Sequence, residues 1–241
     1  MPSNRLSIAN NERRSSVVEN YLLSLYILVE ESRSPTLTQL AAYIRRLPLA
    51  EGLGTSLPTV LGVIRRMSRD GLLKVSAQKE IQLTENGMEV AASIARRHRL
   101  AERLVVDILG MELPWADQEA HMLEHGISSY LEGYINQALG NPITCPFGKP
   151  IPGSDYIKPR GKVVPMNMAK SGTAYRVISL PDEDPRLLKF LSDHEILPGN
   201  WIEIQEMGDY RDVITFRTSA GDGALGFGTA SRIYLIVNER G

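Results

Sequence analysis

The chain has 241 residues, of which 43% are hydrophobic and 23% are charged, and its 27 basic residues nearly balance its 28 acidic ones. This composition excludes collagen-like, disordered and disulfide-rich proteins, and the length suits one large domain or two to three small ones. A single cysteine, Cys145, favours a reducing compartment, and no apolar run reaches the ~20 residues that span a bilayer. We therefore expect a cytoplasmic protein without a membrane partner, preceded by a polar, disordered tail at 1–15.

Charge is distributed unevenly along the chain. Residues 1–80 carry a net charge of +4, residues 81–140 carry −5, and the remainder is neutral. A basic segment can face phosphates and an acidic segment can face cations, so the distribution suggests three units with different partners.

The front segment has the pattern of three helices and a hairpin. Apolar residues recur every fourth position in 17–31, Thr36 can cap the helix that follows, and a third helix runs from Pro58 to a stop at Gly71. Residues 72–87 then alternate as two short strands around Ala77 and Gln78. Three helices with a β-hairpin are typical of a winged helix-turn-helix. The second helix of the helix-turn-helix motif enters the major groove of DNA.

The third helix and the hairpin carry side chains suited to DNA. Hydroxyls near the helix start can read bases or bind phosphate, and arginines further along can hold the phosphate backbone. The candidate DNA-contacting residues are Ser56, Pro58, Thr59, Arg65, Arg66, Arg69, Lys74 and Lys79. A small helical domain with a solvated basic edge, or one that contacts proteins, is the alternative.

The acidic middle contains two clusters of metal-ligating side chains. A long helix is expected over 84–109, followed by shorter ones over 115–124 and 126–139. His98 and Glu102 are spaced i, i+4 on the first of these helices. His121, Glu124 and His125 share one face of the second. Packed face to face, these helices would converge imidazoles and carboxylates, which suit Mn²⁺, Fe²⁺, Zn²⁺, Co²⁺ or Ni²⁺.

Two other interpretations of these clusters stay open. His98 and Glu102 can form a surface ion pair. His121 and His125 can be a pair of hydrogen-bonded histidines in the interior or at the surface. His121 to His125 also fits H-x-x-E-H, the pattern of a zinc peptidase in which the glutamate activates water.

The C-terminal part changes to β patterning. Residues 140–165 are rich in proline and glycine, and four strand candidates follow in the stretches TAYRVISL, NWIEIQEM, DVITFRTS and SRIYLIVN. One short helix is expected among them, within 183–197. A small barrel-like β domain fits this pattern.

Specific segments give the chain a family resemblance. ENYLLSLYIL, LPTVLGVIRRMSRDGLL, IQLTENG, RRHRLAERLVVDILG, EAHMLEHGIS and CPFGKPIPG occur in this order. With them the chain resembles the diphtheria-toxin-repressor family of iron- and manganese-dependent transcriptional repressors over 16–238. The resemblance implies an α+β fold with a winged helix-turn-helix (16–83), a helical metal and dimerisation domain (84–153), a linker (154–167) and an SH3-like, FeoA-like small β-barrel (168–241).

The resemblance further implies a homodimer that binds operator DNA, with a divalent metal as corepressor and no enzymatic activity or small organic substrate. By position, His121, Glu124 and His125 match the site that drives DNA binding, with Asn20 as a ligand from the first helix. His98 and Glu102 match an ancillary site. Asp184 falls where the β domain can lend that site a carboxylate.

This chain departs from the family at three places. Asn20 stands where members carry methionine or aspartate, and His121 stands where they carry cysteine or glutamate. The resemblance implies Mn²⁺ or Fe²⁺, but the imidazole of His121 shifts the preference towards borderline metals, so Zn²⁺, Co²⁺ and Ni²⁺ stay possible. Residues 47–55 resemble an insertion, and Leu61 and Gly62 replace polar base readers. A winged-helix regulator independent of metal, and a purely structural cation site, are the alternatives.

Overall fold

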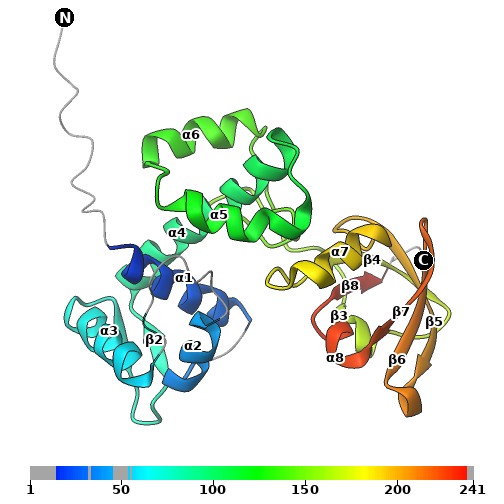
Figure 1. Ribbon diagram of the computed structural model, residues 1–241, viewed down its shortest axis with the longest axis horizontal. Coiled ribbons are helices and arrows are strands. Elements are labelled where there is room, and N and C mark those ends of the chain that lie inside the picture. The colour runs from blue at the N-terminus through cyan, green and yellow to red at the C-terminus, as the bar shows by residue number, and fades with distance from the viewer. Residues whose placement is uncertain (1–14, 32–33, 46–53, 55, 238–241) are drawn as a thin grey trace, which may run out of the picture. The chain divides into compact units, whose positions relative to one another are not determined.

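The computed structural model describes residues 15–31, 34–45, 54 and 56–237 (Figure 1). The predicted tail, apart from Ser15, and most of the predicted insertion at 47–55 lie outside these residues. The chain forms two compact units, one ending at Ala95 and the other beginning at Arg96. In the described ranges, no helix is both long enough and apolar enough to cross a membrane.

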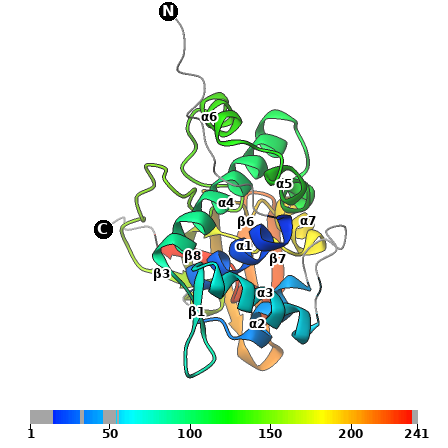
Figure 2. The same ribbon diagram turned by 90° about the vertical axis from the view of Figure 1, so that its left-hand side faces the viewer.

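The first unit has the predicted order of three helices and a hairpin. Its elements are α1 (Ser16–Glu30), α2 (Leu37–Ile44), α3 (Leu57–Arg69), β1 (Leu73–Val75) and β2 (Ile81–Leu83). Local signals set the helix starts, since Thr36 forms a capping box with Gln39 and Ser56 accepts a hydrogen bond from the N–H of Thr59. The antiparallel β1–β2 hairpin projects from the helices of this unit (Figure 2).

One apolar core holds these elements together. Tyr21 and Leu25 of α1 are fully buried with Leu40 of α2 and Met67 of α3. The helix α4 (Glu85–Arg103) joins this core through its first half, where Ala91 is fully buried. The core therefore fixes α3 with its basic side chains outward.

Gly87, at the start of α4, is required by a close backbone approach. A Cβ atom at this position would lie 1.8 Å from the carbonyl oxygen of Leu72, whereas a Cβ at Gly62 in α3 would meet no atom within 4 Å. Gly87→Ala is therefore expected to destabilise the protein by about 1–3 kcal/mol, as overpacking does. Gly62→Ala, the matched control, is expected to stabilise it by about 0.5–1 kcal/mol. Urea unfolding of both variants measures this, and an equal effect in the two would contradict it.

The second unit begins with helices. The second half of α4 continues into a π-helical turn, η2 (Leu104–Ile108), in which the N–H of Leu109 donates to the carbonyl of Leu104. The predicted continuous α-helix over 84–109 therefore ends as an α-helix at Arg103. A 3₁₀ turn η3 (Leu113–Trp115), α5 (Ala116–Glu124) and α6 (Ser129–Ala138) follow.

A six-stranded antiparallel sheet forms the rest of the second unit, in the order β3-β8-β4-β5-β6-β7. The strands are β3 (Val163–Pro165), β4 (Thr173–Ser179), β5 (Trp201–Gly208), β6 (Val213–Thr218), β7 (Gly221–Gly226) and β8 (Tyr234–Val237). The helices α7 (Pro185–Asp193) and α8 (Phe227–Ala230) and the 3₁₀ turns η4 (Met166–Met168) and η5 (Asp209–Arg211) complete it.

The four strands expected from the β patterning are present, as is the helix within 183–197. Two strands were not expected. β3 lies inside the predicted linker and pairs with β8, and the glycine-rich β7 pairs with β6 along its whole length. Each of the two pairs with a strand that the β patterning predicts.

Candidate metal centre

Two helices of the second unit carry a buried cluster of imidazoles and carboxylates. His98 and Glu102 lie on α4, His121 and Glu124 lie on α5, and His125 is the C-cap residue of α5. The i, i+4 spacing on α4 and the i, i+3 spacing on α5 put each pair on one helix face. The side chains of His98, Glu102, His121 and Glu124 are at most 5% exposed.

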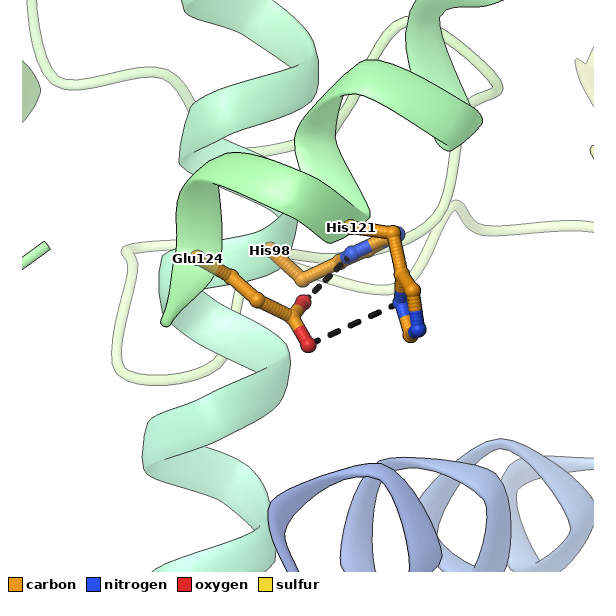
Figure 3. Close-up of side chains that lie close together, drawn as sticks. All are labelled: His98, His121 and Glu124. Atoms are coloured by element: carbon orange, nitrogen blue, oxygen red, sulfur yellow. Dashed lines mark hydrogen bonds and ion pairs between the residues drawn. The ribbon is translucent and has the colours of Figure 1, made fainter. Parts of the chain in front are cut away.

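His98 lies at the centre of this cluster and contacts three carboxylates. Its Nδ1 lies 2.7 Å from Oε2 of Glu124 (Figure 3), while its Nε2 lies 3.1 Å from Oε1 of Glu102 and 3.3 Å from Oδ1 of Asp117. On the other side of Glu124, Nδ1 of His121 and Nε2 of His125 are each 3.6 Å from its Oε1. The two predicted sites are therefore one continuous cluster joined by His98 and Glu124.

The electrostatics of the cluster favour a cation. Burial lowers the pKa of His98, but the carboxylates of Glu102 and Glu124 outweigh that effect and raise it well above its usual value. A protonated imidazole donates from both ring nitrogens, which matches the carboxylates on either side. In this form His98 supplies one positive charge among the three carboxylates of Glu102, Asp117 and Glu124.

The donor atoms also lie close enough to one another to hold a divalent ion. His98, His121 and Glu124 form one group, and His98, Glu102 and Asp117 form another; in each group the ligand atoms lie within 4.8 Å of one another. Buried oxygens Oε2 of Glu102 and Oε1 of Glu124 accept no hydrogen bond from the described residues. Leaving such oxygens unsatisfied is costly, so these residues fit a divalent ion that would accept them as ligands.

Asp117 is a member of the cluster that the sequence analysis missed. It lies four residues before His121, on the same face of α5, so helical spacing could have found it. Burial raises the pKa of Asp117, and its hydrogen bond with His98 opposes that shift.

Asp184 does not occupy the predicted place beside the cluster. It is exposed and caps α7, where its Oδ1 accepts hydrogen bonds from the backbone N–H groups of Arg186 and Leu187. The β-domain carboxylate that interacts electrostatically with His98 and Asp117 is instead Asp182. The prediction for Asp184 is wrong for a local reason. Asp184 directly precedes Pro185, the first residue of α7, so its carboxylate caps the N-terminus of that helix.

Asp182 forms an ion pair with Lys149, in which Nζ of Lys149 lies 2.5 Å from Oδ2 of Asp182. Although burial opposes it, this ion pair lowers the pKa of Asp182. The turn that carries Lys149 is fixed to the β domain, because the N–H of Leu180 donates to the carbonyl of Phe147 and a Cβ at Gly148 would lie 1.9 Å from the carbonyl oxygen of Ile178.

In the first unit, all the predicted DNA-contacting residues are exposed to solvent. They lie on α3, at its N-cap and on the hairpin, outside the core, and Lys79 has a positive φ of 64° in the hairpin turn. The exposed set comprises Ser56, Pro58, Thr59, Arg65, Arg66, Arg69, Lys74 and Lys79. Asn20, also in the first unit, is fully buried on α1, with its backbone carbonyl accepting from Ser24 Oγ.

Comparison with known proteins decides the family. Residues 84–153 match the family described as "Iron dependent repressor, metal binding and dimerisation domain", and residues 164–237 match the FeoA domain. The chain is 35% identical to the iron-dependent repressor IdeR of Mycobacterium leprae over 201 residues, which cover 78% of this chain and 83% of that protein. The chain belongs to the diphtheria-toxin-repressor family.

Other members of the family agree with this assignment. The diphtheria toxin repressor of Corynebacterium diphtheriae is 36% identical over 74% of this chain and 72% of its own length. IdeR of Mycobacterium tuberculosis is 44% identical, but this chain spans only about half of it, at 55%. A solved manganese-dependent transcriptional repressor in complex with manganese superposes with a TM-score of 0.78 at 25% identity, covering 91% of this chain and 99% of that one.

Proposed function

We propose that this protein is a metal-dependent DNA-binding transcriptional repressor of metal-ion homeostasis. The observation that carries the proposal is the buried cluster on α4 and α5, in which two carboxylate oxygens accept no hydrogen bond from the described residues. Its relatives named iron-dependent repressor and its similarity to a manganese-dependent repressor support the same function.

The proposed ligands are the clustered imidazoles and carboxylates, namely His98, Glu102, Asp117, His121, Glu124 and His125. When bound, a divalent ion would supply the positive charge that the buried carboxylates lack. To ligate the ion, His98 would have to lose one proton; the neutral imidazole could then offer one ring nitrogen to the ion and donate a hydrogen bond from the other to a neighbouring carboxylate. Mn²⁺ or Fe²⁺ is the proposed corepressor, and the imidazole of His121 adds affinity for Zn²⁺.

The proposed partner is double-stranded operator DNA bound by a homodimer. The exposed arginines Arg65, Arg66 and Arg69 of α3 would hold the phosphate backbone, while Ser56 and Thr59 at the N-terminal end would face base edges. The metal would not touch DNA. It would shift the population of the dimer towards the geometry that binds the operator.

A peptidase is the weaker candidate. In the H-x-x-E-H reading Glu124 would activate water, but its side chain is completely buried and its Oε2 lies 2.7 Å from Nδ1 of His98. This engagement supports a ligand role for Glu124, and we propose that the protein is not an enzyme.

Titration of the protein's own promoter DNA at fixed salt tests the proposal, with chelator, Mn²⁺, Fe²⁺ or Zn²⁺ present. We expect at least one of the metals to increase operator affinity by about tenfold or more, which requires about 1.4 kcal/mol of differential metal binding. Equal affinity with chelator and with every metal would contradict metal control. A metal that raises thermal stability without changing operator affinity would indicate a purely structural ion.

A further inference from the structure

The second unit has a cavity apart from the buried cluster on α4 and α5. The cavity has a volume of about 540 Å³ and lies between β4, the turn at 144–148 and the segment at 156–160. This volume lies within the range of pockets that bind small molecules. None of the six clustered metal-ligating residues lines it.

The sheet places a cation beside an aromatic ring in this cavity. Arg176 on β4 pairs in register with Trp201 on β5 and with Ile236 on β8, and all three residues line the cavity. Residues directly opposite each other on neighbouring strands point to the same face of the sheet. Arg176 is exposed and Trp201 is 47% exposed, so a guanidinium and an indole are both accessible there.

The cavity has an excess of positive charge. Arg103, Arg160 and Arg176 line it, and among the residues that the structure describes no aspartate or glutamate does. Arg103 is held by the carbonyl of Thr144 and by Asp107, whose Oδ2 lies 3.2 Å from its Nη1.

The other two arginines keep donors for a ligand. Arg176 donates through Nε to the carbonyl of Gly199, at 3.1 Å, and its two terminal nitrogens form no hydrogen bond with a described residue. Neither Arg176 nor Arg160 forms an ion pair with any described part of the chain. An anion in the cavity would therefore meet guanidinium groups that no carboxylate already neutralises.

We propose that this cavity binds a small organic anion, a carboxylate or phosphate group carried on a flat ring. A planar guanidinium offers two parallel donors to such an oxyanion, and Arg176 would take this role. Trp201 and Tyr156 supply aromatic surfaces for the ring. The molecule would be bound and released without chemical change, which agrees with the proposal that the protein is not an enzyme.

Calorimetric titration of the metal-free full-length protein tests the site. The probes are benzoate and phenyl phosphate, with benzyl alcohol as the uncharged counterpart and inorganic phosphate as the counterpart without a ring. We expect the two ring anions to bind at least about tenfold more tightly than either counterpart. Their relative affinity distinguishes a carboxylate site from a phosphate site.

Variants locate the binding. Arg176→Gln is expected to weaken ring-anion binding about 10- to 100-fold, since it removes a charged hydrogen-bond donor. Arg217→Gln is the matched control, because Arg217 is an exposed arginine on β6, paired with Asp222 and outside the cavity. It is expected to leave binding unchanged.

Three results would overturn the proposal. The ring anions could fail to bind at millimolar concentration, or the two variants could weaken binding equally. Alternatively, Arg176→Gln and Arg160→Gln could weaken binding of duplex DNA while ring anions do not bind, which would assign this surface to the phosphate backbone of DNA.

Discussion

Replacing His98 with alanine is expected to abolish metal-stimulated binding to operator DNA. His98 is the residue shared by both groups of ligand atoms, and it contacts Glu102, Asp117 and Glu124 from its two ring nitrogens. Loss of an outer-shell partner alone costs about 10- to 100-fold in metal affinity, so loss of a shared ligand is expected to cost at least about 100-fold.

Calorimetry with Mn²⁺ and Zn²⁺, followed by operator titration, measures this effect. His98→Gln is the second variant, because an amide can still donate a hydrogen bond to the neighbouring carboxylates and so guards against a failure to fold. Glu119→Gln is the matched control, since Glu119 is an exposed carboxylate on the same α5 helix. Retention of metal-stimulated binding by both His98 variants would show that the metal binds elsewhere.

Replacing Lys149 with methionine is expected to destabilise the protein by about 3 kcal/mol, as removal of one partner of a buried ion pair does. Lys149 and Asp182 are only 20% and 11% exposed, and the variant would leave the carboxylate of Asp182 without its cation. The destabilised element is the contact between the turn at 145–149 and the β domain.

Urea unfolding of Lys149→Met beside Lys189→Met measures this cost. Lys189 pairs with Asp193 at a similar distance, but both side chains are more than half exposed, so its loss is expected to change stability little. In Lys149→Met, the further change Asp182→Leu is expected to restore much of the loss, because it removes the uncompensated charge. Equal stability of the two single variants would contradict this prediction, because it would mean that another cation or water molecules stabilise the carboxylate of Asp182.

Local signals made much of the fold predictable. Ser56 and Thr36 precede their helices at the capping position, and apolar residues recur at helical spacing in α1 and α3. Such signals act between residues close in the chain, so they can be read from the sequence. The π-helical turn at Leu104–Ile108 and the strand β7 are exceptions. β7 has no β-branched residue, and its pairing with β6 is what makes it a strand.

Most members of the buried cluster could be paired on helix faces from the sequence, because i, i+3 and i, i+4 spacing decides which side chains share a helix face. The sequence therefore determined the residue types of the cluster: imidazoles and carboxylates on two helices. Only the tertiary structure decided that His98 joins both groups and that Asp182 rather than Asp184 interacts with them. These relations join different elements, and distances between elements depend on how side chains pack around them, which spacing along one chain does not encode.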